Sequence, residues 1–377
     1  IKLKYRMQNL KIWSYISFPW LVFTMIFFVG FFSLAFLTQI DNAFLSSNYL
    51  LSLFVNTILL SIGSAIFSTL IAVPLAILVT FYKFPGQKFF SWALSLSLAF
   101  PAYVYAFIFV GIFEYSSPVS EFLREAGIVL PAIKNLFGGS IIMSMALFPY
   151  IFLLTKAQLS SVGVNIFKAA KSLGDDNLTA IYKVILPSLK PSIIAGMALV
   201  IFETIADFGG VSTLRIETFT VGIYDAWFGY QNYFSAARLS GYLLLFVLFI
   251  IFMSKYFQTD SNSLASKTAE NFEGIKLSKF RQYLLMGLCS LIFILVFCIP
   301  LLQLLFWHID SLKFDLIENI NLLLNSLILG IICSLLTVFF AVSLALSYRE
   351  SKRLRPIISI SSSGYSIPGS VIAAGLL

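Results

Sequence analysis

Long apolar stretches separated by short polar segments dominate this chain. A helix that crosses the hydrocarbon core of a bilayer needs roughly 20 consecutive apolar residues. The stretches that meet this length, with boundaries good to a few residues, are 12–38, 51–81, 91–113, 138–158, 191–207, 238–256, 283–306, 320–347 and 357–377. The pattern predicts an all-α integral membrane protein, a polytopic helical bundle of about nine spans.

Composition supports this assignment and narrows the chemistry. Hydrophobic residues make up 59% of the 377 positions and charged residues 11%, whereas soluble domains carry about 45–50% and about 25%. A single His argues against general-base or metal chemistry. The three Cys lie in apolar runs without a CxxC pair, so neither a disulfide framework nor a zinc site is indicated. We therefore predict no catalytic residues, and no resident metal ligands are assigned.

Basic residues predict the orientation of the spans, because Lys and Arg concentrate in short cytoplasmic loops. With the N-terminus inside, the cytoplasmic segments contain most of the 25 basic residues, among them Lys2, Lys4, Arg6, Lys11, Lys83, Lys88, Lys168, Lys171, Lys183, Lys276, Lys279, Arg281, Arg349 and Lys352. The outer segments carry most of the acids instead. The net charge of +8 is thus a topology signal, and no nucleic-acid partner is predicted.

The chain also resembles itself. Residues 56–76 (NTILLSIGSAIFSTLIAVPLA) align with 325–345 (NSLILGIICSLLTVFFAVSLA), and Pro101 matches Pro368 with two residues of slippage. Generic apolar similarity is the alternative to duplication. Duplication predicts two parallel repeats, the second truncated. The expected domains are 1–256 (first transmembrane repeat, including a loop at 160–191), 257–282 (cytoplasmic linker) and 283–377 (partial second repeat).

The loop at 160–191 has helical apolar spacing on both sides of Gly174. The spacing predicts two short amphipathic helices, with Asp175, Asp176 or Asn177 capping the second and Pro187 ending it. Such a pair of helices either fits a groove on another protein or lies on the lipid surface, helped by its lysines.

Glu203 and Asp207 are acidic residues at membrane depth. Their spacing of four places them on one helix face if the helix continues, and such carboxylates usually face a polar interior. They either attract a cation or position a gate in the substrate pathway, or they have a structural role such as capping the break at Gly209 and Gly210.

Two motifs resemble a known family. KAAKSLG (168–174), followed by VILP (184–187), resembles the EAA loop of ABC importer permeases, with Lys168 in place of the family's Glu. LVIFETIADFGGVSTLRIETFTVGIYDAWF (199–228) is similar to the ferric-iron branch of these permeases. The resemblance covers nearly the whole chain.

The resemblance implies a permease subunit in a bacterial inner membrane, which works with a cytoplasmic ABC ATPase dimer and a periplasmic substrate-binding protein. ATP would be hydrolysed on the ATPase, in agreement with the absence of a GxxxxGK[ST] sequence here, so the chain itself binds no cofactor and is no enzyme. The residues that match the coupling loop are Lys168, Ala169, Ala170, Gly174, Ile185 and Pro187.

Several points stay open at this stage. The second half stops before a second EAA loop, so this chain alone is expected to couple to one ATPase copy. Permeases for thiamine, polyamines or phosphonate share the architecture, and an ion-driven secondary transporter is the alternative from another class.

Overall fold

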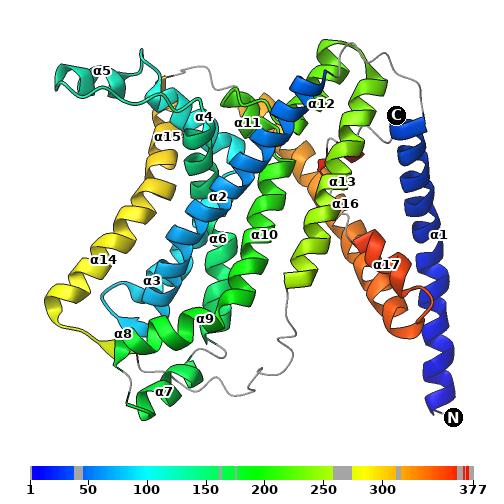
Figure 1. Cartoon of the computed structure of the whole chain (residues 1–377), viewed down its shortest axis with the longest axis horizontal. Coiled ribbons are helices and arrows are strands. Elements are labelled where there is room, and N and C mark those ends of the chain that lie inside the picture. Colours follow the sequence, from blue (N-terminus) through cyan, green and yellow to red (C-terminus); the bar gives the residue numbers. More distant parts are fainter. Residues whose placement is uncertain are drawn as a thin grey trace.

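A computed structural model describes residues 2–37, 46–160, 164–174, 176–257, 274–310, 316–362, 368, 369, 371 and 372. The described chain is helical apart from one ladder of two short strands. Figure 1 shows the long helices running between two ends of a bundle, with α7, α8 and α9 at one end and α5, α11 and α12 at the other.

Seven helical stretches in the described residues are long and apolar enough to cross a membrane, or eight if one bent pair is a single span. They lie in α1 (Lys2–Leu37), α2 (Ser47–Phe81), α4 (Ala102–Phe113) with α5 (Pro118–Glu125), α6 (Leu136–Gln158), α13 (Tyr233–Phe257), α14 (Lys279–Phe293) with η5 (Ile294–Cys298) and α15 (Ile299–Asp310), and α16 (Leu316–Glu350). The bent pair is 181–188 and α10 (Lys190–Ala206), which meet at 54°. The polytopic helical membrane fold is confirmed, with fewer spans than the nine predicted.

Two of the nine predicted spans are not among the seven: 191–207 is present only as part of the bent pair, and 357–377 lies largely outside the described residues. A third, 91–113, is replaced by the stretch at 102–125. Residues 91–113 are not one continuous helix: α3 (Gln87–Ala93) and the 3-10 turn η1 (Leu94–Ala99) lead to an extended Phe100, and Pro101 then caps α4. The break follows from Pro101, since proline lacks an N–H and pushes the preceding residue into extended conformation. The span at 357–377 begins in α17 (Arg355–Ser362) and continues largely outside the described residues.

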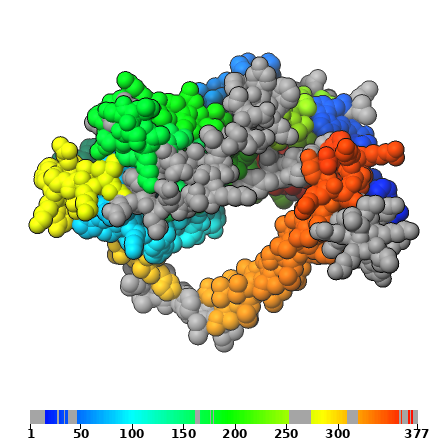
Figure 2. All heavy atoms as spheres, turned by 90° about the horizontal axis from the view of Figure 1, so that it is seen from below, coloured from blue at the N-terminus to red at the C-terminus, as the bar shows by residue number. Residues whose placement is uncertain are grey.

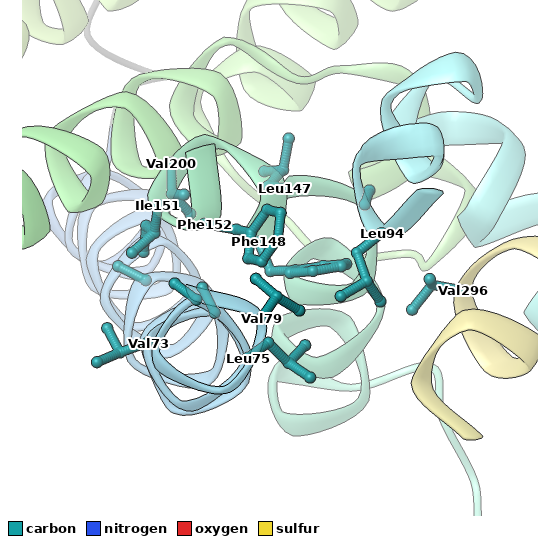
Figure 3. Packing of buried hydrophobic residues seen from close by; sticks show 14 of the residues in the cluster. Val73, Leu75, Val79, Leu94, Leu147, Phe148, Ile151, Phe152, Val200 and Val296 are labelled. Atoms are coloured by element: carbon teal, nitrogen blue, oxygen red, sulfur yellow. The ribbon is translucent and has the colours of Figure 1, made fainter. Parts of the chain in front are cut away.

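The main core lies where α2 packs against α6 and α10. Figure 3 shows Val73 and Val79 of α2 close to Phe148, Ile151 and Phe152 of α6 in this core. The buried positions of α2 include many small residues, namely Ser61, Ser64, Ala65, Ser68, Ala72 and Ala76. Small side chains let helix backbones approach closely in membranes, where van der Waals packing drives association.

Helices far apart in the sequence pack on each other across the molecule. Near the N-terminus, α1 contacts α16, with the rings of Trp20 and Phe340 stacked at 4.4 Å and the hydroxyls of Ser17 and Ser347 2.8 Å apart. On the opposite side, α14 contacts α3. Viewed from the α7–α9 end, α16 stands away from the body of the bundle (Figure 2).

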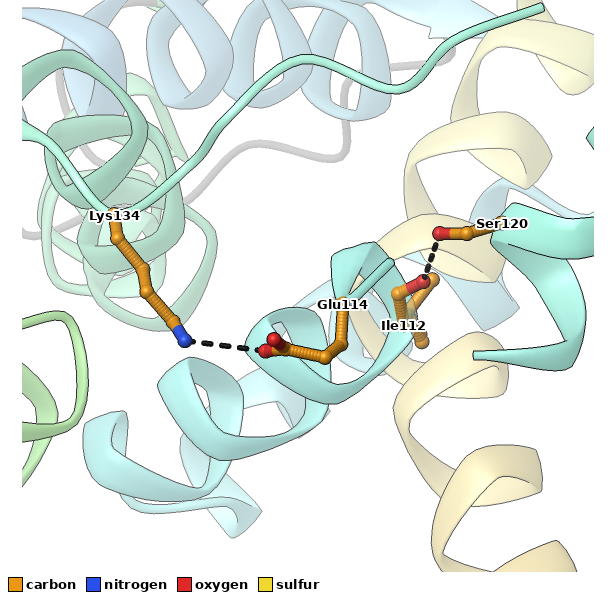
Figure 4. Close-up of polar contacts among 4 residues, drawn as sticks. All are labelled: Ile112, Glu114, Ser120 and Lys134. Atoms are coloured by element: carbon orange, nitrogen blue, oxygen red, sulfur yellow. Dashed lines mark hydrogen bonds and ion pairs between the residues drawn. The ribbon is translucent and has the colours of Figure 1, made fainter. Parts of the chain in front are cut away.

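The end of the bundle that carries α5 is joined by polar contacts. Lys134 Nζ forms an ion pair of 3.1 Å with Glu114 Oε2, and Ser120 Oγ donates a hydrogen bond of 3.1 Å to the carbonyl of Ile112 (Figure 4). These contacts tie α5 and the segment before α6 to the end of α4.

The predicted linker at 257–282 contributes one element to the fold. Its residues 258–273 lie outside the described residues, but β2 (Ile275–Lys276) follows them and pairs in parallel with β1 (Tyr82–Lys83) directly after α2. This ladder was not predicted, because its two strands are too short to show a pattern in the sequence.

The predicted repeats have one structural correlate. Helices α2 and α16 are each 35 residues long, and Asn56 and Asn325 each lie nine residues after the helix start. The described residues show no second copy of the first half beyond this equivalence, so the repeats and the domain division stay predictions.

Candidate functional site

Two helical segments joined at Gly174 form the end of the molecule opposite α5. Helix α7 (Val164–Ser172) leads to Gly174, whose φ of +97° lies in the left-handed region that glycine tolerates best. Asp176 then caps the next helix, because its Oδ1 accepts a hydrogen bond of 3.1 Å from the N–H of Thr179. Asp175 lies outside the described residues. The structure therefore contains the helix pair and the glycine turn that the sequence indicates.

The second segment does not end at Pro187 as predicted. Helix α8 (Asn177–Ala180), the π-helical turn η3 (Ile181–Ile185) and α9 (Leu186–Ser188) follow one another without interruption, and the bend to α10 comes at Leu189. In the wide turn the N–H of Leu186 bonds to the carbonyl of Ile181, five residues back. This turn shifts the acceptors just before Pro187, so the helix accommodates a residue without an N–H.

Two of the six predicted coupling residues face the chain's own core. Ala170 is 4% exposed and Ile185 is fully buried. Beside Ala170, the ring of Phe167 packs 5.0 Å from that of Phe81 at the end of α2. These residues hold the helix pair on the bundle, so they are not available to a partner.

The other four predicted coupling residues face outward. Lys168, Ala169, Gly174 and Pro187 are exposed. Two large side chains that were not singled out for this role share the surface, Leu173 at 87% and Tyr182 at 67% exposure. Leu173 follows Ser172, the last residue of α7, and its side chain points outward. We call the four exposed coupling residues together with Leu173 and Tyr182 the outer face of the helix pair.

A small apolar pocket lies between α2 and the second segment of the helix pair. It measures about 410 Å³ and is lined by residues that include Val73, Tyr82, Ile181 and Tyr182. Burial, and to a lesser extent the neighbouring Tyr182, raise the pKa of Tyr82 above its ordinary value. Its hydroxyl is therefore neutral at physiological pH, as suits an apolar contact surface.

Glu203 and Asp207 line one cavity, although not by the geometry predicted. Helix α10 ends at Ala206, and Asp207 is extended (φ −70°, ψ 128°), so the two residues do not share a helix face. Both nevertheless line a cavity of about 330 Å³. The remaining lining comes from 98–103, from α6 and from Phe208, and it includes Pro101 at the break before α4.

Tyr150 adds a polar group that the sequence analysis missed. It lies on α6 within the cavity lining, and its hydroxyl donates a hydrogen bond of 3.3 Å to Glu203 Oε1. The sequence carries a weak signal for this residue, since a tyrosine next to Pro149 within an apolar span needs a partner for its hydroxyl. Only the fold shows that the partner is 53 residues away.

Asp207 organises the broken helix that follows it. Its Oδ2 accepts hydrogen bonds from the N–H groups of Gly210 (2.8 Å) and Val211 (3.1 Å), at the start of α11 (Gly209–Thr213). A Cβ on Gly210 would lie 2.7 Å from the same oxygen, so only glycine allows this approach. The contact agrees with the structural alternative proposed for Asp207, while a role in the substrate pathway stays a prediction.

The segment after α11 is bonded to the same point. Thr220, in α12 (Phe219–Tyr224), donates a hydrogen bond of 2.8 Å from its hydroxyl to the carbonyl of Asp207. The N–H of Phe219 donates to Thr57 Oγ1 on α2 at 3.2 Å. The TFT sequence, noted before only as a resemblance, therefore connects the broken helix to α2.

The charges of this cavity are one-sided. Among the described residues that line it, two are carboxylates and none is Lys, Arg or His. No group of three or more His, Cys, Asp or Glu residues that would hold a metal ion occurs in the described part of the chain. The cavity thus presents oxygen atoms that suit a passing cation, without the ligand set of a resident metal site.

An apolar helical bundle with an exposed helix pair at one end and a carboxylate-lined cavity at a broken helix defines a multi-pass membrane transport protein. Residues 68–259 match the family model described as "Binding-protein-dependent transport system inner membrane component". The chain belongs to this family of ABC importer permeases. It is therefore a multi-pass inner-membrane permease component, without a catalytic function of its own. Family membership also removes the ion-driven secondary transporter as an alternative.

Similar proteins fall into more than one substrate class. An Fe(3+)-transport system permease protein of Haemophilus influenzae is 29% identical over 337 residues, which cover 85% of this chain and 62% of that protein. A sulfate transport system permease protein of Salmonella typhimurium is 27% identical over 41% of this chain and 55% of the relative. This chain therefore spans less than two thirds of the length of these relatives.

A solved structure shows the same fold. The crystal structure of a bacterial ABC transporter involved in the import of the acidic polysaccharide alginate aligns with a TM-score of 0.54. The alignment covers 69% of this chain and 100% of the other, at 16% sequence identity.

Proposed function

We propose that this chain forms the translocation pathway for ferric iron in an ABC importer, receives the ion from a periplasmic binding protein and is driven by a cytoplasmic ABC ATPase dimer. The similarity to the Haemophilus influenzae Fe(3+) permease over 85% of the chain supports this proposal. In this proposal the N-terminus and the helix pair lie in the cytosol, in agreement with the basic residues at that end of the bundle.

The observation that carries the choice of substrate is the charge of the cavity. Two carboxylates and a tyrosine hydroxyl line it, and none of its described lining residues is cationic. Hard cations prefer oxygen ligands, while an oxyanion would be repelled by Glu203 and Asp207 at short range. Although sulfate and molybdenum permeases are also similar to this chain, the cavity therefore favours a cation.

The outer face of the helix pair suits the ATPase contact. Ala169 and Gly174 present little side chain, and Leu173 and Tyr182 project beyond them. A surface with projecting apolar groups beside small residues fits a groove on a partner protein. Its buried side, anchored on α2, would transmit a movement of the ATPase to the bundle.

Uptake of radiolabelled ferric iron by cells tests the proposed pathway. The chromosomal gene is altered to give Glu203→Gln with Asp207→Asn, which keeps the size of both side chains and one acceptor oxygen on each and removes their charge. A hydrogen bond or close contact to a charged group contributes about 1.5–3 kcal/mol to binding. We therefore expect uptake to fall by roughly tenfold or more. The matched control is Glu121→Gln with Glu125→Gln on the exposed helix α5, with uptake close to wild type.

Uptake that is unchanged in the Glu203 and Asp207 variant would leave these residues only their structural role. A parallel assay with radiolabelled sulfate decides the substrate class. Sulfate uptake that depends on this gene, without dependence of iron uptake, would overturn the iron assignment.

A further inference from the structure

A pair of lysines faces outward on the short ladder of β1 and β2, which pairs the segment after α2 with the segment before α14. Lys83 of β1 is paired directly with Lys276 of β2, and both side chains are exposed. Their strand neighbours Tyr82 and Ile275 turn the other way and pack against the main core. Because paired residues of adjacent strands point to the same face, the two lysines stand side by side.

This arrangement has an electrostatic cost. Neighbouring strands lie about 4.8 Å apart, and like charges directly opposite each other are destabilising. The stem of Lys83 lies close to Gly274, because a Cβ added there would be 3.0 Å from Lys83 Cγ. An anion bound between the two side chains would relieve this repulsion.

Three more cations follow the two strands closely in the sequence. Lys88, Lys279 and Arg281 are exposed and lie within five residues of Lys83 or Lys276, which is at most about 17 Å of chain. Residues 81–93 and 274–285 contain neither Asp nor Glu. We call Lys83, Lys276 and these three residues the basic ladder patch.

Exposed apolar side chains continue from this patch along the bundle. On α3, Phe89 and Trp92 are exposed and their rings pack at 5.6 Å. On α14, Phe280, Tyr283 and Leu284 are exposed beside the basic residues. Aromatic residues next to Lys and Arg are typical of the boundary between the hydrocarbon and the headgroups of a bilayer.

We propose that the basic ladder patch is a binding site for an anionic phospholipid of the leaflet on the α7–α9 side. The phosphate would lie between Lys83 and Lys276 and relieve their repulsion, and the acyl chains would lie on the exposed aromatic surface of α3 and α14. Since β1 follows α2 and β2 precedes α14, the bound lipid holds together two regions of the chain that this short ladder connects.

Lipid titration of the purified full chain tests the site. The protein in a neutral detergent is titrated with phosphatidylglycerol and, separately, with phosphatidylcholine, and bound lipid is counted by native mass spectrometry. Each lysine near an anionic membrane surface contributes roughly fivefold in affinity. We expect Lys83→Gln with Lys276→Gln to weaken phosphatidylglycerol binding on the order of 30-fold, to leave phosphatidylcholine unaffected, and wild-type binding to weaken as salt is raised.

The matched control, Lys168→Gln with Lys171→Gln, removes the same charge from the same end of the molecule. An equal loss in this control would show a diffuse charge effect and overturn the proposal. If the wild-type chain bound phosphatidylcholine as tightly as phosphatidylglycerol, the proposal would also be overturned. This comparison uses only the wild-type protein, so it does not depend on whether a variant folds. Displacement of the lipid by millimolar inorganic phosphate would assign the patch to a soluble anion.

The acids of the preceding segment provide the last arm. Glu270 and Glu273 lie outside the described residues, and a Glu270→Gln, Glu273→Gln variant asks whether they neutralise the lysines. Lipid binding that occurs only in this variant would show that the patch is paired within the chain, contrary to the proposal. Binding equal to wild type supports it.

Discussion

The carboxylate cavity and the helix pair differ in how far a structural role and a functional role fall on the same residue. In the cavity, Asp207 is bonded through its carboxylate to two backbone N–H groups and through its carbonyl to Thr220. In the helix pair, Ala170 is buried while its neighbour Ala169 is exposed. A substitution of Asp207 therefore disturbs the local structure as well as the proposed pathway, whereas in the helix pair adjacent residues separate a structural effect from an effect on the proposed contact.

The largest effect is expected where this separation is sharpest. Ala170→Glu places a carboxylate in the apolar cluster that contains Phe167 and Phe81, and an unpaired buried charge costs roughly 3 kcal/mol or more. Ala169→Glu adds the same group on the surface and should change the free energy of unfolding by less than about 0.5 kcal/mol. Unfolding of the purified variants by SDS, followed by circular dichroism, measures both.

The same pair of variants sharpens the proposed ATPase contact. Ala169→Glu should keep the fold and reduce iron uptake in cells, since it places a charge on the outer face of the helix pair. If Ala169→Glu leaves uptake at the wild-type level, this face does not bind the ATPase closely. Equal destabilisation by the two substitutions would contradict the burial difference itself.

The next largest effect tests whether the structural role of Asp207 can be separated from its charge. Asp207→Ala leaves the N–H groups of Gly210 and Val211 without their acceptor, which should cost about 2 kcal/mol. Asp207→Asn keeps an oxygen acceptor and should cost less than about 1 kcal/mol, because Asn caps nearly as well as Asp. SDS unfolding compares the two, and equal stability would show that the cap contributes nothing.

The smallest effect concerns the connection through Thr220. Thr220→Val removes the hydroxyl that donates to the carbonyl of Asp207 and should cost about 1 kcal/mol. Thr213→Val is the control, because the Thr213 hydroxyl bonds within its own helix to the carbonyl of Gly209, and we expect less than about 0.5 kcal/mol. Equal losses in SDS unfolding would mean that the link between α12 and Asp207 has no special weight.

Local features of the site could be predicted from the sequence. The turn at Gly174 and the cap after it depend on residues a few positions apart, and both occur in the structure. Features that need a distant partner could not be predicted. Tyr150 meets Glu203 across 53 residues and Thr57 meets Phe219 across 162. The sequence did indicate the end of α10, with a span ending at 207 and a break at Gly209 and Gly210, but it did not show that Asp207 is already extended and so leaves the helix face of Glu203.

The same limit explains the two long helices with matching sequences. Both α2 and α16 have 35 residues and the same apolar pattern, yet 44% of the apolar window of α2 is buried against 6% for α16. The pattern determined length and membrane character, since these depend on the hydrophobicity of the segment itself. Burial depends on which helices pack alongside. In the described residues α6 and α10 pack against α2, whereas α16 packs mainly against α1.

By itself, then, the sequence determined the membrane class, most of the spans and the helix pair, because apolar length, glycine turns and caps are local properties. The tertiary structure decided which alanine faces outward, that Glu203 and Asp207 line one cavity, and that Lys83 stands beside Lys276. Each of these depends on contacts between segments distant along the chain, whose geometry no local pattern encodes.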